Sequence, residues 1–287
     1  MTSSSIQSDP SVVDLHDPRL YERRAVVTAI RGGFDAITDA HIEQFGELGF
    51  LSIDDAFTPE EVGAGIDGLL HLIAGGNPEF KGIQFEAAAR DLLPTLTIEQ
   101  RQDAVRKLMW FVEFDARLKA LSHHQKLLAT VSRLLGPESA PQMFQDMALL
   151  KPPKLGREKP WHQDKAYFNI DVREPVVGVW VALDEATPEN GCMHLLPDIG
   201  RAPRLHYMRR DWQICDTEIL GTPCIAAPLK PGGVLLFDGL LVHGTPHNGS
   251  GQRRRAVQFH YQGNRFPKIE NDARMSIYGG EGRNVEC

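Results

Sequence analysis

The chain has 287 residues, and 31 Lys and Arg against 38 Asp and Glu give it a formal net charge of −7. Hydrophobic residues make up 42% and charged residues 24%, which excludes disorder, collagen-like repeats and low-complexity polymers for most of the chain. The acidic balance also argues against a nucleic-acid binder, which would usually carry a net basic face.

The N-terminal part is expected to be mainly helical. Residues 1–35 are polar and irregular and read as a partly ordered arm, and 36–138 form the helical part. Within it, 50–53 predicts a short strand. The capping box Thr-Pro-Glu-Glu opens a helix over 58–74, and a second helical block is expected over 98–135, before a Gly-Pro stop.

The second half has a different sequence pattern, in which short apolar runs alternate with Pro, Gly and Asn. These runs are 147–150, 176–183, 193–196, 234–237 and 256–261. Repeated short strands with turn signals predict a sandwich or barrel over 139–262, followed by a C-terminal extension over 263–287. Because no linker separates the two halves, we expect one domain over 36–287.

Cysteine usage and the chain start predict a cytoplasmic protein. The four cysteines form no C-x-x-C pair and are too few for a disulfide framework (Cys192, Cys215, Cys224 and Cys287). No apolar stretch near the start has the form of a secretory signal, and no apolar run is long enough to cross a bilayer.

Three residues suggest a metal site in the β-rich half. His162 and Asp164 are two positions apart, so on a strand both would face one side, and His243 follows a later apolar run. Two imidazoles and one carboxylate form the facial triad that holds non-haem Fe(II). Each element alone is weak, because short His/Asp pairs occur by chance. Arg254, eleven residues after His243, adds a guanidinium that can hold a dicarboxylate through two hydrogen bonds.

These motifs together resemble the phytanoyl-CoA dioxygenase family of Fe(II)- and 2-oxoglutarate-dependent oxygenases, over residues 36–262. The matching stretches are LKPP at 150–153, WHQD at 161–164, VWVAL at 179–183, ENGC at 189–192 and the run from His243 through Asn248 to Arg254-Arg255-Ala256. The resemblance implies a mainly β protein with α: a double-stranded β-helix (a cupin-like jelly roll) with N-terminal helices packed outside.

The resemblance also implies roles for individual residues. His162, Asp164 and His243 resemble the catalytic iron ligands, and Arg254 and Thr245 resemble the groups that hold the far carboxylate of 2-oxoglutarate. Four further residues are candidates for the same co-substrate pocket: Trp180, Met147, Gln145 (by strand parity with Met147) and Lys107, from the helical part. For Trp180 and Met147 the alternative is core packing, and for Lys107 it is a solvated helix face.

The activity implied is that of a non-haem iron dioxygenase using Fe(II), 2-oxoglutarate and O₂. It would hydroxylate an unactivated C–H bond of a small organic substrate and release succinate and CO₂. In related halogenases a small residue replaces the carboxylate ligand, so Asp164 disfavours halogenation. Desaturation, epimerisation or cyclisation of a natural product stays open. So does a cupin-like metal isomerase or binding module, although such a protein has no need for Arg254.

The substrate is the least determined feature. Tyr167 and Phe168 follow the His-x-Asp pair and are expected to contact it. The basic insertion 201–222 could form a lid that meets a carboxylated substrate or a CoA ester, and its alternative is a solvated loop. His194 and His260 are expected to be hydrogen-bonded core histidines rather than metal ligands.

Overall fold

The computed structural model describes residues 16–136, 139–264 and 268–280. Its α-helices are α1 (Asp39–Leu48), α2 (Pro59–Ile73), α3 (Ile98–Ala104), α4 (Ala116–Ser122), α5 (Gln125–Leu135), α6 (Asp216–Ile219) and α7 (Asn271–Tyr278). Its strands are β1 (Arg23–Val26), β2 (Phe50–Ile53), β3 (Ile83–Phe85), β4 (Val105–Met109), β5 (Pro141–Lys151), β6 (Lys159–His162), β7 (Val177–Ala182), β8 (Met193–Leu195), β9 (Tyr207–Met208), β10 (Trp212–Gln213), β11 (Cys224–Ala227), β12 (Val234–Asp238), β13 (His243–Thr245) and β14 (Arg254–Gly263). Five short 3₁₀ helices lie between them: η1 (Pro18–Tyr21), η2 (Gly33–Ala36), η3 (Ala87–Thr95), η4 (Asp164–Tyr167) and η5 (Pro197–Ile199).

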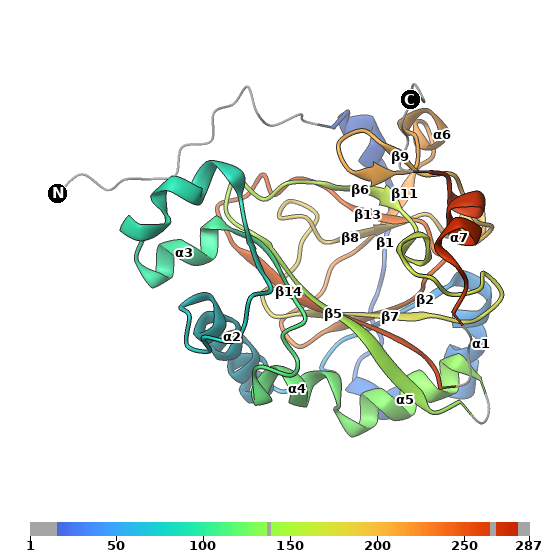
Figure 1. Ribbon diagram of the computed structural model, residues 1–287. Coiled ribbons are helices and arrows are strands. Elements are labelled where there is room, and N and C mark those ends of the chain that lie inside the picture. Colours follow the sequence, from blue (N-terminus) through green and yellow to red (C-terminus); the bar gives the residue numbers. More distant parts are fainter. Residues whose placement is uncertain (1–15, 137–138, 265–267, 281–287) are drawn as a thin grey trace.

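Two sheets face each other across the core (Figure 1). The smaller has the order β1-β11-β8-β13-β6, and the larger has the order β2-β12-β7-β14-β5-β4-β3. From β5 onward the chain passes back and forth between the sheets in the manner of a jelly roll, with β5, β7, β12 and β14 in the larger and β6, β8, β11 and β13 in the smaller. Between β8 and β11, β9 and β10 form a separate two-stranded sheet. The double-stranded β-helix expected from the sequence is confirmed.

Strand alternation divides the larger sheet into a helix-covered face and an inner face. In β7, Val179 and Val181 join a core shared with the helices, whereas Trp180 and Ala182 point toward the smaller sheet. Figure 1 shows α2, α4 and α5 covering the outer face. The helices therefore stabilise the outer face, and the inner face is left to line a site.

The predicted helix after Thr58 is confirmed as α2, together with its capping box. The Thr58 hydroxyl accepts a hydrogen bond from the backbone N–H of Glu61 (3.2 Å), and the Glu61 carboxylate accepts one from the backbone N–H of Thr58 (2.8 Å). Gly68 in α2 lets α4 approach closely, because a Cβ at this position would lie 3.0 Å from Leu118. The capping box thus fixes the start of α2, and the glycine allows α2 to pack closely against α4.

The prediction of one helical block over 98–135 was wrong in its middle. Residues 105–109 form β4, which pairs antiparallel with β5, placing Lys107 opposite Leu149. The stretch V-R-K-L-M starts with a β-branched residue, and its pairing satisfies the open backbone edge of β5. The strands β2, β3 and β4 all join the larger sheet, so the segment 36–138 is not only helical.

The described part of the N-terminal arm packs into the fold. The strand β1 pairs in parallel with β11, and the ring of Tyr21 stacks on Trp161 with 5.0 Å between centroids. The part of the predicted arm in 1–15 lies outside the described residues, as do 265–267 and 281–287 of the predicted extension.

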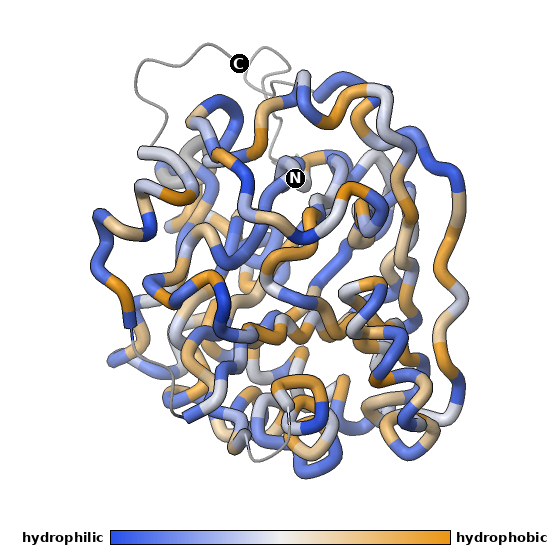
Figure 2. The backbone as a smooth tube through the Cα atoms, turned by 90° about the vertical axis from the view of Figure 1, so that its right-hand side faces the viewer, coloured by the Kyte–Doolittle hydropathy of each residue, from blue (hydrophilic) through white to orange (hydrophobic). Residues whose placement is uncertain are grey.

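Hydrophobic residues come in short runs along the tube of Figure 2, separated by hydrophilic ones. Among the helices that the structure describes, none has the length and apolar character needed to cross a bilayer.

The buried imidazole of His194 makes the stability of the fold pH-dependent. Its side chain is 1% exposed, its Nδ1 lies 3.1 Å from the carbonyl oxygen of Cys192, and burial lowers its pKa from 6.5 to about 4. Between these values the unfolded chain binds a proton that the folded chain does not, so stability decreases as the pH falls from about 6.5 toward 4.

Within that window His194 contributes about 1.4 kcal/mol per pH unit to the slope of the unfolding free energy against pH. We expect the variant His194→Leu to lose this contribution. Urea denaturation of the metal-free protein and of the variant at several pH values between 7 and 4 measures this difference. Parallel slopes for the two proteins would contradict the expectation.

Candidate metal centre and its pocket

Two histidines and one aspartate meet at one end of the jelly roll. His162 ends β6 and His243 begins β13, and the two residues are paired in register. The Nε2 of His162 lies 3.2 Å from Oδ1 of Asp164, and the Nε2 of His243 lies 3.6 Å from its Oδ2. One ligand atom from each residue lies within 4.8 Å of the others, and all three residues are buried.

The expected position of Asp164 on the same strand as His162 was wrong. The strand ends at His162, and Asp164 is the first residue of the 3₁₀ turn η4. The turn, rather than strand alternation, brings the carboxylate back beside the imidazole. The two side chains still lie side by side because they are only two residues apart in the chain.

Hydrogen bonds to backbone carbonyl groups orient the two histidines for metal binding. The Nδ1 of His162 lies 2.7 Å from the carbonyl oxygen of Pro160, and the Nδ1 of His243 lies 2.9 Å from that of Leu241. A carbonyl only accepts hydrogen bonds, so each Nδ1 carries the proton and each Nε2 presents its lone pair toward Asp164. This donor set, two imidazole nitrogens and one carboxylate, fits a non-haem Fe(II) ion.

The electrostatics of the cluster favour the metal-binding protonation states. Burial and then the neighbouring His162 lower the pKa of His243 to about 3, so the imidazole is neutral. Burial opposes ionisation of Asp164, but the nearby His243, His260 and His162 side chains together hold its pKa well below the usual value. Neutral imidazoles beside an ionised carboxylate are the forms that bind a metal.

Asp164 has two further partners that the sequence did not reveal. Its Oδ2 accepts hydrogen bonds from the amide of Gln258 (2.9 Å) and from Nε2 of His260 (2.8 Å). His260 is therefore a buried, hydrogen-bonded histidine rather than a ligand, as expected, but its hydrogen bond goes to a ligand of the candidate metal site. Both residues share strand parity with Arg254 on β14, and that parity is the signal that could have found them.

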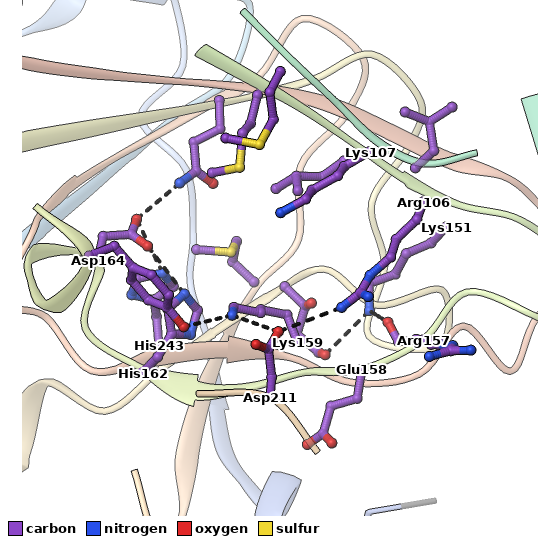
Figure 3. A pocket seen from close by; sticks show the side chains of 18 of the residues that line it. Arg106, Lys107, Lys151, Arg157, Glu158, Lys159, His162, Asp164, Asp211 and His243 are labelled. Atoms are coloured by element: carbon purple, nitrogen blue, oxygen red, sulfur yellow. Dashed lines mark hydrogen bonds and ion pairs between the residues drawn. The ribbon is translucent and has the colours of Figure 1, made fainter. Parts of the chain in front are cut away.

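Beside the triad lies a cavity between the sheets (Figure 3). The predicted site residues that border it are His162, Asp164, His243, Thr245, Arg254, Met147, Gln145, Lys107, Tyr167 and Phe168. Trp180 is not among the residues that border it, and instead packs beneath Arg254, whose guanidinium carbon lies 5.4 Å from the centroid of the ring.

Arg254 is a buried cation with unused hydrogen-bonding capacity. Its side chain is 1% exposed, one guanidinium nitrogen donates to the carbonyl oxygen of Leu149 (3.1 Å), and burial lowers its pKa to about 10. Among the described residues, its Nε has no hydrogen-bond partner, and neither has the indole nitrogen of Trp180. An anion in the cavity would supply the missing acceptor.

Lys107 enters the cavity from β4 on the side opposite the triad (Figure 3). Within the described chain its ammonium makes no hydrogen bond or ion pair, and burial and then Lys159 and Arg106 lower its pKa. Because residues 105–109 form a strand, the expected helix face for Lys107 was wrong, and the side chain lines the site.

Further cations border the cavity near Lys107, and the sequence reading missed them. Lys159 and Arg106 share Asp211, at 2.9 and 3.7 Å, and Arg157 pairs with Glu86 at 3.3 Å. These residues come from β4, β6 and the loop before β6, which the fold brings together. No local pattern in the sequence marks them as a group.

The basic insertion 201–222 supplies little of this charge. Arg210 pairs with Glu158 at 2.7 Å, Arg201 with Asp238 at 3.3 Å, and Arg204 with Glu218 at 3.4 Å. Of this segment, Asp211 borders the cavity. The insertion is thus tied to the protein by ion pairs, and the cations beside the cavity come from other segments.

The two aromatic residues after Asp164 lie where a substrate could reach them. The Tyr167 hydroxyl accepts a hydrogen bond from Lys159 (2.9 Å) and donates one to the carbonyl oxygen of Trp212 (2.6 Å). The Phe168 ring packs edge-on against His260, with 4.8 Å between centroids. Both border the cavity, and their contact with substrate stays a prediction.

Known proteins show the same combination of sequence and fold. The family described as "Phytanoyl-CoA dioxygenase (PhyH)" matches residues 45–256. The chain is 24% identical over 264 residues to phytanoyl-CoA dioxygenase domain-containing protein 1 of Danio rerio, covering 79% of this chain and 90% of the relative. It is 27% identical to the ectoine dioxygenase of Sphingopyxis alaskensis, covering 71% and 69%.

A solved structure is similar over most of the chain. The protein EvdO2 of Micromonospora carbonacea var. aurantiaca is 26% identical and matches with a TM-score of 0.62, covering 85% of this chain and 96% of its own. EvdO2 has also been solved in complex with 2-oxoglutarate.

Proposed function

The chain belongs to the phytanoyl-CoA dioxygenase family of non-haem iron, 2-oxoglutarate-dependent oxygenases, and from this premise we propose that it hydroxylates an unactivated C–H bond of a small organic substrate. Succinate and CO₂ would be the co-products. The observation that carries the proposal is the buried His162–Asp164–His243 cluster beside a cavity bordered by a buried Arg254, whose Nε has no hydrogen-bond partner among the described residues.

The protein side chains hold the metal and leave room beside it. His162 and His243 would each bind the metal through Nε2 and Asp164 through its carboxylate, which would leave positions for other ligands. Bound Fe(II) supplies the activation of O₂ that 2-oxoglutarate decarboxylation and C–H oxidation require. A carboxylate at position 164 occupies the place that a halide ligand would need, which favours hydroxylation over halogenation.

The co-substrate would lie between the triad and Arg254. Arg254 would bind its distal carboxylate with the Thr245 hydroxyl beside it, and Trp180 would support the guanidinium from below. Met147, Gln145 and Lys107 line the adjacent walls, and we assign them to the same pocket. Burial strengthens each of these polar contacts because water does not screen them.

The substrate would carry an anionic group, either a carboxylate or the phosphates of a CoA ester. Arg106, Arg157 and Lys159 supply positive charge at the side of the cavity away from the triad, and the two carboxylates they contact are Asp211 and Glu86. A third carboxylate, Glu158, also borders the cavity but pairs with Arg210 at 2.7 Å, so three cations against the two remaining carboxylates leave a positive excess there. Tyr167 and Phe168 would contact the part of the substrate nearest the metal.

The proposal is tested with Fe(II) and 2-oxoglutarate added to the protein under anaerobic conditions. We expect a weak metal-to-ligand charge-transfer band in the visible region and a higher temperature of unfolding. After admission of O₂, succinate release is screened across acyl-CoA esters, amino acids and terpenoid or polyketide acids, and anionic compounds should stimulate it more than their neutral amides. Absence of both the band and the stabilisation would refute the oxygenase function.

A further inference from the structure

We infer that His260 and Gln258 are positioning residues that hold Asp164 as a one-oxygen metal ligand. The inference rests on the proposed function, because it concerns the same metal centre. It goes beyond that function by assigning the protein groups that fix the orientation of the carboxylate.

The two residues are presented by a rigid element. The strand β14 lies in the middle of the larger sheet, paired with β7 on one side and β5 on the other. Its residues 254, 256, 258 and 260 face the interior between the sheets. One strand therefore carries the Arg254 guanidinium and, four and six positions later, both partners of Asp164.

The hydrogen bonds of Asp164 are unequally divided between its two oxygens. Oδ2 accepts from Gln258 (2.9 Å) and from His260 (2.8 Å), whereas Oδ1 faces Nε2 of His162 at 3.2 Å. Rotation of the carboxylate about its Cβ–Cγ bond would break both bonds to Oδ2. Two donors on one oxygen thus leave the other oxygen as the better metal ligand.

The unequal use of the two ring nitrogens of His260 supports this inference. Nε2 contacts Asp164 at 2.8 Å, whereas Nδ1 is buried without a hydrogen-bond partner among the described residues. A buried polar atom without a partner destabilises the folded protein, and this is a cost. An apolar side chain would avoid this cost, so the ring is explained by the bond that its other nitrogen makes.

Aromatic neighbours fix the ring in that orientation. Phe168, Phe144 and Phe237 surround the imidazole of His260, with centroid separations of 4.8, 6.0 and 6.2 Å. The side chain is fully buried. The ring can therefore act as a fixed donor rather than a mobile one, which is what a group that orients a metal ligand must do.

The test compares Gln258→Met and His260→Leu with His260→Gln, whose amide nitrogen can take the place of the imidazole Nε2 as a donor. The matched control is His194→Leu, because His194 is equally buried but touches none of the three ligands. Two properties are measured anaerobically: the affinity for Fe(II), by titration, and the position of the charge-transfer band with 2-oxoglutarate. Unfolding of the metal-free variants is followed in parallel.

We expect Gln258→Met and His260→Leu to weaken Fe(II) binding about 10–100-fold and to shift the band. His260→Gln should recover part of the affinity, and His194→Leu should retain wild-type affinity and band. Wild-type affinity and band in folded Gln258→Met would overturn the inference, and this variant decides if His260→Leu does not fold. Failure of the wild-type protein to bind Fe(II) would instead refute the proposed function.

Discussion

Replacing His162 with alanine is expected to abolish Fe(II) binding and, with it, succinate formation. The change removes one of two imidazole ligands and leaves Asp164 and His243 buried without their partner. Changes to groups that only orient a ligand cost about 10–100-fold in metal affinity, and loss of a ligand costs more. We therefore expect affinity and turnover below detection.

Anaerobic titration with Fe(II) measures the effect, with His247→Ala as the matched control. His247 is four residues beyond His243, and its Nε2 contacts the carbonyl oxygen of Lys154 at 3.0 Å rather than the triad. The control should bind Fe(II) as the wild-type protein does. Undiminished metal affinity in folded His162→Ala would contradict the assignment of His162 as a ligand.

Arg254→Ala is expected to weaken 2-oxoglutarate binding about 100- to 1,000-fold while leaving the metal in place. The guanidinium is fully buried, so its removal would leave the distal carboxylate of the co-substrate in the interior without a counter-charge. Breaking a buried ion pair in this way costs about 3–5 kcal/mol. Arg254→Lys should lie between, because an ammonium cannot form two parallel hydrogen bonds with a carboxylate.

The matched control is Arg253→Ala, one residue earlier on the chain. Arg253 faces the opposite way and pairs with Asp103 and Glu99, both at 2.7 Å. Calorimetric titration of 2-oxoglutarate into protein loaded with Mn(II) separates co-substrate affinity from catalysis. Equal affinities for Arg254→Ala and the wild-type protein, or simultaneous loss of Mn(II) binding, would contradict the role.

The basic run 253–255 shows what the rule of strand alternation can predict from the sequence. Strand alternation predicts that Arg254 faces one way and its neighbours the other, and the structure confirms it: Arg253 and Arg255 pair with Asp103 and Asp184 outside the cavity. The same rule failed for Asp164, because β6 ends before it. Alternation is reliable inside a strand, and the end of a strand depends on which neighbour it pairs with.

Residue types and spacings in the sequence predicted a sandwich or barrel, the three candidate ligands and the arginine, and the family resemblance narrowed the fold to a jelly roll. Only the tertiary structure showed that residues 105–109 form a strand. In this strand the side chains of Lys107 and Arg106 both border the cavity. The tertiary structure also placed His260 on Asp164, 96 residues away in the chain. Such contacts arise from the pairing and packing of distant strands, which no local periodicity encodes.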